Sequence, residues 1–410
     1  MRPALALFTL ALLPCALTSA RDGAPMTAKT AALLQAGQEP VRIVCFGDSI
    51  TGVYYHTGGR RAWHDMLALA LQRLYPQARI EMTNAGISGH TTVDALARID
   101  RDVLAHRPHL VVVMFGMNDV TRVPPESFRA NLAEIVQRCR GVGAEVVLCT
   151  PNSVYPEDSA RPVAKLAAYA QIVRDVAAEQ RAPLADCYQA YEDVRARDRR
   201  AWMALMSETI HPNMRGHKLF AEVVAQVVSG KRVSLDDEPP PFPALPRTLS
   251  LLAKHQPVKV LAMPPYDTLI PGALKFLAPD ARAKITTWPT EGQSLAQIEA
   301  WSKTVRDLRP DLVVVAVPAT AAAASEEQFL RSYSWVLNWS LSFGYQEWDC
   351  IAILPSVADP MLSPTERAAE TTALEVIEGQ DIGWLQRAPN DETPAGELLA
   401  KWFLSQARRP

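Results

Sequence analysis

The chain has 410 residues, of which 48% are hydrophobic and 21% charged, and its formal net charge is -2. This length favours two domains, each large enough to bury its own core. The balanced charge gives no basic surface typical of nucleic acid binding, so we expect a neutral or weakly charged partner.

The first 20 residues, MRPALALFTLALLPCALTSA, have the features of a secretory signal peptide. One arginine precedes an apolar run of suitable length, and small residues follow at Thr18 and Ala20. Pro3 and Pro14 interrupt the run and argue against an amphipathic first helix. No later apolar run could span a bilayer, so we expect an exported protein, periplasmic or extracellular, without stable membrane insertion.

From residue 41, short β-branched segments alternate with amphipathic helical segments at the spacing of βαβ units. The expected strands are VRIVCF, RIEMT, LVVVMF and AEVVLCT, and the expected helices are RAWHDMLALALQRLY, TVDALARIDRDVLAHR, SFRANLAEIVQRCR, VAKLAAYAQIVRDVAAEQR and a last one near Gly216 to Val228. This alternation predicts a parallel sheet covered by helices on both faces, in a first domain over residues 41–230.

Six cysteines occur in the chain, and removal of the signal peptide would leave five. An odd number argues against a full disulfide framework. Cys45 and Cys149 fall in expected strands, where a thiol behaves as a small hydrophobic group. No pair of cysteines has the spacing of a zinc site, so no metal is expected from them.

A proline-rich stretch follows the first domain, with six prolines between residues 239 and 257. Such a density interrupts helices and central strands and predicts a linker over residues 231–257.

The pattern of the first domain then restarts over residues 258–408. VKVLAMPPYDT matches VRIVCFGDSIT, and RPDLVVV (309–315) matches RPHLVVV (107–113), in the same order along the chain. Valine-rich strands are common to βαβ folds, but the shared string and the preserved order favour duplication. We therefore expect a second, smaller α/β domain of similar topology.

Polar residues follow the expected strands of the first domain at four places. Ligands of a parallel α/β sheet gather outside the carboxyl ends of its strands, so these residues are expected to meet at one edge. They are Ser49 in GDSIT, Gly86 and Gly89 in NAGISGH, Asn118 in FGMND, and Glu208 with His211 in SETIHPN.

These residue types suit acyl transfer. Ser49 supplies an oxygen nucleophile, and His211 is a base that accepts its proton near neutral pH. Glu208, three residues earlier, can reach the imidazole Nδ1 and fix its tautomer. The backbone N–H groups of Ser49 and Gly89 and the amide of Asn118 are three donors for the oxyanion of a tetrahedral intermediate.

The motifs GDSIT, the second-strand glycine, GxND and ExIHPN resemble the four signature blocks of the SGNH, or GDSL, hydrolase family over residues 41–230. The resemblance implies that Ser49 is the nucleophile, that His211 is the base, and that Ser49, Gly89 and Asn118 form the oxyanion hole. It also implies a three-layer flavodoxin-like fold and ester hydrolysis without a metal or cofactor. The family usually has aspartate where this chain has Glu208, which puts the geometry of the orienting carboxylate in question.

Each of these residues also has a structural interpretation. Ser49 could cap the following helix, and Asn118 could be a turn residue. We expect Gly86 to provide a positive φ and Gly89 the oxyanion donor, and Asp48 and Asp119 to brace their loops.

Three further histidines, His56, His90 and His217, lack metal-ligand spacing, and they are expected to be hydrogen-bonded or surface residues. The segment VYYHTGGRRAW after Ser49 carries aromatic and polar side chains around two glycines. It is expected to form a wall of the substrate pocket through Tyr54, Tyr55 and His56, and the alternative is an exposed loop without substrate contact.

The second domain lacks the same chemistry. Tyr266 stands at the position of Ser49, Pro264-Pro265 replace Gly-Asp, Thr320 replaces Asn118, and no histidine follows residue 255. We expect a degenerate, non-catalytic domain that acts as a scaffold, a lid, a polysaccharide-binding surface or a dimerisation unit.

The sequence therefore predicts an exported serine esterase acting on carboxylic esters, such as a small ester or O-acetyl groups on carbohydrate. Lysophospholipase-like or acyltransferase activity at the same site is one alternative. A non-catalytic glycan-binding protein is another.

Overall fold

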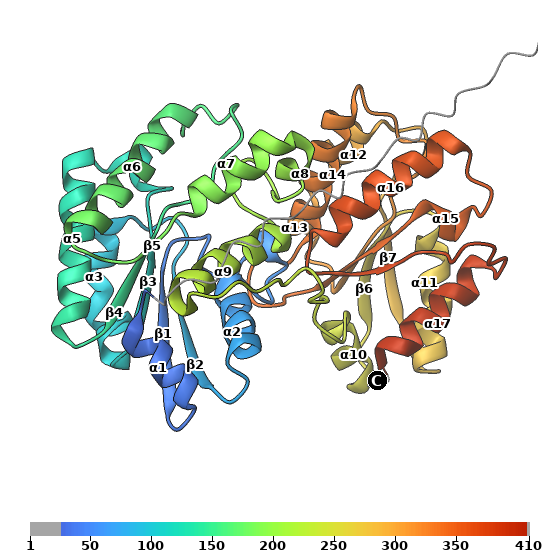
Figure 1. The fold of residues 1–410 in the computed structure, drawn as a ribbon. Coiled ribbons are helices and arrows are strands. Elements are labelled where there is room, and N and C mark those ends of the chain that lie inside the picture. The colour runs from blue at the N-terminus through green and yellow to red at the C-terminus, as the bar shows by residue number, and fades with distance from the viewer. Residues whose placement is uncertain (1–25, 408–410) are drawn as a thin grey trace, which may run out of the picture.

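The structure of the protein, a computed structural model, describes residues 26–407. Its strands form two parallel sheets, each flanked by helices, that stand side by side (Figure 1). The signal peptide expected at residues 1–20 lies outside the described residues. Within residues 26–407, none of the helices combines the length and apolar character needed to cross a bilayer.

The first sheet has five strands in the order β2-β1-β3-β4-β5, all parallel. This is the order of flavodoxin-like folds, so the expected fold class is confirmed. The central strands are buried along most of their length, as their near-continuous valine and isoleucine content requires. The strands are β1 (Pro40–Gly47), β2 (Arg79–Gly86), β3 (Leu110–Met114), β4 (Glu145–Cys149) and β5 (Leu184–Ala185).

Helices cover both faces of this sheet (Figure 1). One face carries α1 (Ala28–Ala36), α2 (Trp63–Leu74) and α9 (Met214–Ser229), and the other carries α3 (Thr92–Asp102), α5 (Pro125–Gly141) and α6 (Val163–Glu179). The remaining elements of this half are the single turns η1 (Tyr55–Thr57) and η2 (Leu104–His106), and the helices α4 (Asp119–Arg122), α7 (Cys187–Arg197) and α8 (Arg199–Met203).

The second sheet repeats the topology of the first, in the order β7-β6-β8-β9-β10. Its strands are β6 (Val258–Ala262), β7 (Ala283–Thr287), β8 (Leu312–Val315), β9 (Asp349–Ile353) and β10 (Gly383–Leu385). The helices α11 (Tyr266–Leu277) and α17 (Ala395–Ala407) pack together, as do α12 (Leu295–Ser302), α14 (Glu326–Ser340) and α16 (Pro364–Glu378). The shorter helices are α13 (Val305–Leu308) and α15 (Pro355–Ala358).

The two RPxLVVV segments adopt the same local geometry. Each arginine before the proline has a left-handed backbone, with φ 48° at Arg107 and 44° at Arg309. The residue after each proline then donates its N–H to a neighbouring strand of its sheet, His109 to the Arg42 carbonyl on β1 at 2.8 Å and Asp311 to the Lys259 carbonyl on β6 at 2.7 Å. The similarity that the sequence shows in this segment therefore extends to backbone conformation.

The segment 231–257 was expected to be a linker without helix, and this is wrong for its second half. Residues Pro246–Ala253 form α10, which packs on β6 and β9 and buries Leu251 and Leu252. Pro246 stands at the first helical position, where a missing N–H costs nothing. Pro246 therefore begins this helix and does not prevent it.

The halves of the chain share one continuous cluster of buried apolar side chains. Helix α14 of the C-terminal half lies against α8 of the N-terminal half (Figure 1), and it also packs on η1. The turn η1 follows directly after the GDSIT loop, so the C-terminal half reaches the edge where the polar residues were expected to meet.

Candidate active site

Ser49 lies two residues beyond the end of β1, at the carboxyl edge of the first sheet. The turn is closed by the carbonyl of Asp48, which accepts the N–H groups of Thr51 and Gly52 at 3.2 and 3.1 Å. A side chain at Gly47 would meet the Thr51 hydroxyl at 2.1 Å, so the tight turn requires glycine there. The Ser49 side chain remains 8% exposed and points its Oγ at His211 Nε2, 2.8 Å away.

Glu208 lies on the other side of the same imidazole. One of its carboxylate oxygens contacts His211 Nδ1 and also accepts the backbone N–H of His211 at 2.9 Å. The other accepts the N–H of Ile210 at 3.2 Å. Burial alone would raise the pKa of the Glu208 carboxyl, but the charge and hydrogen bonds of His211, with the Ile210 amide, hold that pKa below its ordinary value.

The loop that carries Glu208 and His211 is fixed to its surroundings. The Ser207 N–H donates to the His211 carbonyl at 2.9 Å, which closes the loop on itself. The Asn152 amide, just beyond β4, donates to the Ile210 carbonyl at 2.9 Å. These contacts fix the backbone of the loop in which the Glu208 carboxylate meets Nδ1.

The backbone N–H groups of Ser49 and Gly89 have no acceptor within the described part of the chain. Gly89 has φ +77°, and a Cβ added there would meet no atom within 4 Å, so its surroundings are open. The guanidinium of Arg122 holds the Gly89 carbonyl. The Asn118 amide nitrogen lies 3.2 Å from the His90 carbonyl and 3.4 Å from Asp48 Oδ2.

The expectation that Gly86 provides a positive φ is wrong, because that conformation belongs to Gly89. Gly86 is instead the last residue of β2 and packs against the GDSIT turn. A side chain there would meet the backbone N of Gly52 at 2.3 Å and the Asp48 carbonyl at 2.9 Å. Glycine is required at residue 86 for close approach.

The two aspartates do brace their loops. Asp48 accepts the Ile50 N–H at 2.9 Å, and Asp119 accepts the N–H groups of Thr92 at 2.8 Å and Gly116 at 3.1 Å. Asp48 is fully buried, and this burial raises its pKa to about 7 despite the Ile50 amide and the nearby His211.

The two tyrosines after the GDSIT turn contact different parts of the site. The Tyr54 hydroxyl accepts the Ser88 N–H at 3.2 Å and so steadies the loop that carries Gly89. The Tyr55 ring stands edge-on to His211, with centroids 5.6 Å apart and the hydroxyl 3.4 Å from Nδ1. Burial raises the pKa of the Tyr55 hydroxyl to about 12, so it stays protonated.

His56 does not line a pocket, because its side chain is fully buried. Its ring is stacked between His211 and His217, with centroid distances of 4.6 and 5.4 Å and interplanar angles of 19°. Neither of its nitrogens has a hydrogen-bond partner among the described residues, so the expectation of a hydrogen-bonded or surface histidine is also wrong. Burial, with the neighbouring His211 and His217, holds the pKa of His56 well below its ordinary value, so the ring is neutral.

His217 is buried as well, and its Nδ1 accepts the Trp63 N–H at 3.0 Å. The remaining one of the three histidines, His90, is half-buried and keeps its Nδ1 without a partner in the described part of the chain. Within residues 26–407, no group of three or more His, Cys, Asp and Glu side chains is arranged to hold a metal ion. The five cysteines in that range are free and buried.

The loop of residues 54–63 packs against the C-terminal half and is not an exposed loop. Arg61 forms a two-pronged ion pair with buried Asp381, at 2.7 and 2.9 Å. Gly59 lies so close to Gly344 that an added Cβ would be 1.8 Å from its carbonyl oxygen. Tyr55 stacks on Phe343, with centroids 5.6 Å apart.

Sequence reasoning missed several residues around the site. Asn152 follows β4 and would have been found if the rule about strand ends had been applied there as well. Phe343 and Arg306, which contact Tyr55, come from the C-terminal half. No motif identifies them, since their positions depend on how the halves pack.

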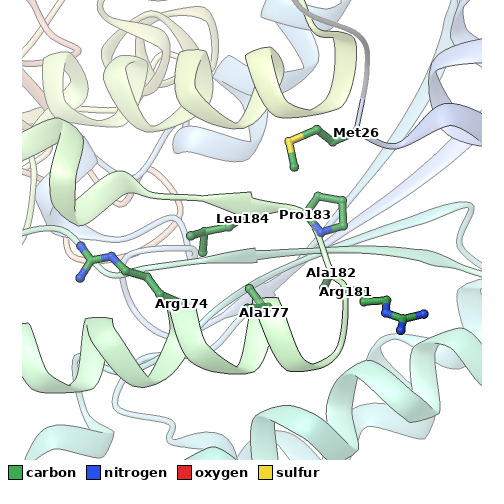
Figure 2. Close-up of a pocket in the computed structure, with 8 residues that line it drawn as sticks. Met26, Arg174, Ala177, Arg181, Ala182, Pro183 and Leu184 are labelled. Carbon is green, nitrogen blue, oxygen red and sulfur yellow. The ribbon is translucent and has the colours of Figure 1, made fainter.

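A hollow of about 520 Å³ lies away from these residues, at the amino end of β5 (Figure 2). Met26, Arg174 and the segment 181–184 line it, and it includes none of the expected site residues. The hollow lies at the amino ends of the strands, whereas Ser49 lies at their carboxyl ends. It therefore takes no part in chemistry at Ser49.

The comparisons with known proteins bear on the first half of the chain. The model of the GDSL-like Lipase/Acylhydrolase family matches residues 45–219. The chain is 29% identical to an acetylxylan esterase of Geobacillus stearothermophilus over 162 residues, which are 37% of this chain and 73% of that protein. It is 32% identical to an arylesterase of Vibrio mimicus over 117 residues, 28% of this chain and 57% of the relative.

A crystal structure of an acetylxylan esterase from Geobacillus stearothermophilus is 25% identical and superposes with a TM-score of 0.40, over 46% of this chain and 94% of that one. The family match covers the GDSIT turn, the Gly89 loop, Asn118 and the segment of Glu208 and His211. Residues 45–219 belong to the GDSL-like lipase/acylhydrolase family, and the chain is an ester hydrolase of the SGNH type.

Proposed function

We propose that this protein is an exported serine esterase that removes small acyl groups, acetyl above all, from carbohydrate esters. The observation that carries the proposal is the line of hydrogen bonds from Ser49 Oγ through His211 to Glu208, with 2.8 Å between Oγ and Nε2. This is the arrangement that a serine nucleophile, its base and an orienting acid require.

In the first half of the reaction, Ser49 Oγ attacks the ester carbonyl while His211 Nε2 takes its proton. Glu208 stabilises the resulting imidazolium through Nδ1, and its lowered pKa keeps it ionised for this role. The alcohol then leaves with the proton from Nε2, and an acyl group remains on Ser49. A water molecule, deprotonated by the same nitrogen, releases the acid and restores the serine.

Negative charge on the carbonyl oxygen is met by three donors. The N–H groups of Ser49 and Gly89 are free to donate within the described structure. The Asn118 amide keeps its contact with the His90 carbonyl, and the oxyanion replaces the longer contact with Asp48. Each donor of this kind contributes on the order of a hundredfold to the rate.

The substrate class rests on two kinds of support. Ser49 and His211 are only 8% and 6% exposed, which favours a small acyl group over a long chain. An acetylxylan esterase is among the relatives of the first half, and it connects this family with acetylated carbohydrate. Export rests on the sequence of residues 1–20 alone.

We further propose that residues 258–408 form a non-catalytic domain. Tyr266, at the position of Ser49, opens α11 with its side chain 2% exposed. Thr320 stands where the first half has Asn118, and the domain contains no histidine that could act as a base.

Labelling with an organophosphonate serine probe tests the proposed chemistry. We expect mass spectrometry to find the label on Ser49 and expect His211→Ala to abolish it. Hydrolysis of nitrophenyl acetate should exceed that of nitrophenyl octanoate. A preference for octanoate would favour a lysophospholipase-like enzyme, and transfer to an added alcohol would favour an acyltransferase. Absence of both label and turnover would overturn the esterase proposal.

A further inference from the structure

A group of aromatic side chains from the C-terminal half stands beside the catalytic histidine. We define the aromatic platform as Trp335, Trp339 and Phe343 together with Arg306, which lies among the rings. Phe343 stacks on Tyr55 at 5.6 Å and 18°, and Tyr55 in turn contacts His211. The ring of Tyr55 therefore stands between Phe343 and His211.

The Arg306 guanidinium lies over two rings of the platform and over Tyr55. Its Cζ is 4.4 Å from the Trp339 ring centroid, 4.5 Å from that of Tyr55 and 5.3 Å from that of Phe343. Cation–π contacts of this kind stabilise the arrangement of the rings. One helix residue, Asn338, accepts a hydrogen bond from Arg306 Nη2 through its carbonyl, at 3.0 Å.

Arg306 forms no ion pair with any carboxylate in the described part of the chain. Its Nε is buried without a hydrogen-bond partner, and Nη1 has none among residues 26–407 either. Burial lowers the pKa of this guanidinium, with Tyr55 and Glu208 opposing the shift. Because Nε is out of reach of solvent, Nη1 is the donor of this guanidinium that remains for a ligand.

The platform exposes flat apolar surface. Phe343 is 52% exposed, and neighbouring Tyr345 is 79% exposed. Trp335 and Trp339 stack on each other with centroids 6.1 Å apart and are both half-buried. Exposed apolar side chains that lie together and are bordered by polar groups are typical of ligand-binding surfaces.

The combination of rings and N–H donors selects the chemistry of the ligand. A sugar ring places its C–H faces on aromatic rings and offers hydroxyl oxygens to a guanidinium. A lipid chain would instead need a continuous apolar groove without a charged group among its walls. The surface therefore fits carbohydrate better than an acyl chain.

We propose that the aromatic platform binds the sugar portion of the ester. It reaches the site through Tyr55, on which Phe343 stacks and whose ring stands edge-on to the imidazole of His211. This inference rests on the proposed esterase function and adds to it: the C-terminal half contributes substrate specificity to a site whose reacting groups all come from the N-terminal half.

The test compares esters that differ in the alcohol. Acetylated xylotriose and acetylated cellotriose offer sugar rings to the platform, whereas ethyl acetate offers none. For Phe343→Ala and Trp339→Ala we expect the ratio of kcat/KM on the better trisaccharide to kcat/KM on ethyl acetate to fall at least tenfold, mainly through KM. Phe276→Ala, at an exposed aromatic residue on α11, is the matched control and should keep the wild-type ratio.

A ratio within threefold of wild type in both platform variants would overturn the inference while leaving the esterase proposal intact. Binding supplies a readout that does not depend on turnover. Calorimetry with Ser49→Ala should detect at least one of the two acetylated trisaccharides, and Ser49→Ala combined with Phe343→Ala should bind it at least tenfold more weakly. Failure of both sugars to bind would also overturn the inference. Sugar binding that depends on Phe343, in a wild type that hydrolyses no ester, would overturn the esterase proposal and leave the platform as a sugar-binding surface.

Discussion

Asn338 donates its side-chain amide to the hydroxyl of Ser207 at 3.0 Å, in a buried hydrogen bond between the two halves of the chain. Ser207 directly precedes Glu208, so α14 of the C-terminal half holds the loop that carries the proposed acid and base. Arg306 and the Tyr55–Phe343 stack lie near the same helix. The C-terminal half therefore supports the loop of Glu208 and His211 through a buried hydrogen bond.

Replacing Asn338 with leucine should lower both stability and turnover. The Ser207 hydroxyl would lose its buried partner, which costs about 1–3 kcal/mol, and the loop would hold His211 less firmly. We expect kcat on nitrophenyl acetate to fall several-fold with little change in KM, measured together with urea unfolding. The double variant Ser207→Ala/Asn338→Leu removes both polar groups and should recover much of the stability. Equal stability of Asn338→Leu and wild type would show that the hydrogen bond is unimportant.

The roles of Glu208 and His211 differ in a measurable way. Glu208→Gln keeps the shape of the side chain but removes the negative charge that faces the imidazolium. By analogy with other triads, kcat should fall about 10⁴-fold, whereas His211→Ala, which removes the base, should cost about 10⁶-fold. Single-turnover kinetics on nitrophenyl acetate would measure both. Identical losses would mean that the carboxylate is as indispensable as the imidazole.

The fold and the reacting groups were accessible from the sequence because both depend on local patterns. Valine-rich strands alternating with amphipathic helices define a parallel sheet, and strand ends in such a sheet converge. Ser49, Asn118 and His211 could therefore be brought together without coordinates. The same reasoning extended to Asn152 would have added one more residue of the site.

What could not be predicted depends on packing between distant segments. A histidine in a loop rich in glycine and arginine is expected near solvent, yet His56 is buried because two other imidazoles and the C-terminal half cover it. Arg61 and Asp381 are 320 residues apart, and no sequence motif around either residue predicts their ion pair. The pairing is fixed by the three-dimensional fit of the halves.

The ring of His56 stacks on His211, and the effect of this flat ring can be tested separately from the effect of its two nitrogens. Phenylalanine at residue 56 keeps a flat ring between His211 and His217 and removes two buried nitrogens that lack partners. We expect His56→Phe to retain activity within a few-fold and to be at least as stable as wild type. His56→Ala leaves a cavity, costs about 2–4 kcal/mol and lowers kcat. Thermal unfolding and nitrophenyl acetate turnover test both, and a loss in His56→Phe as large as in His56→Ala would reveal a chemical role for the imidazole.

Asp48 gives the protein a stability that depends on pH. Burial raises its pKa to about 7 in the folded state, above the value of 3.8 for a free side chain. The folded protein then holds this proton more tightly than the unfolded chain, so the contribution of Asp48 to stability falls as pH rises from about 4 to 7. Asp48→Asn cannot ionise and should gain stability relative to wild type across that window, by at most about 1.4 kcal/mol per pH unit. Urea unfolding at pH 4 and pH 8 measures the change, and a difference that does not vary with pH would contradict it.

Gly59 and Gly58 provide a matched pair for testing the contact between the halves. Both have left-handed backbones, with φ +67° and +68°, so alanine at either position costs about 1 kcal/mol from strain. At Gly58 the added Cβ meets only a Leu341 methyl group at 3.7 Å, but at Gly59 it would be 1.8 Å from the Gly344 carbonyl oxygen. Gly59→Ala must therefore displace the loop 341–346 from the loop that carries Tyr55. We expect it to be clearly less stable than Gly58→Ala and to lose more turnover, since Tyr55 and His56 hold His211 in place. Urea unfolding and kcat on nitrophenyl acetate measure the two effects, and equal behaviour of the two variants would show that this contact does not support the site.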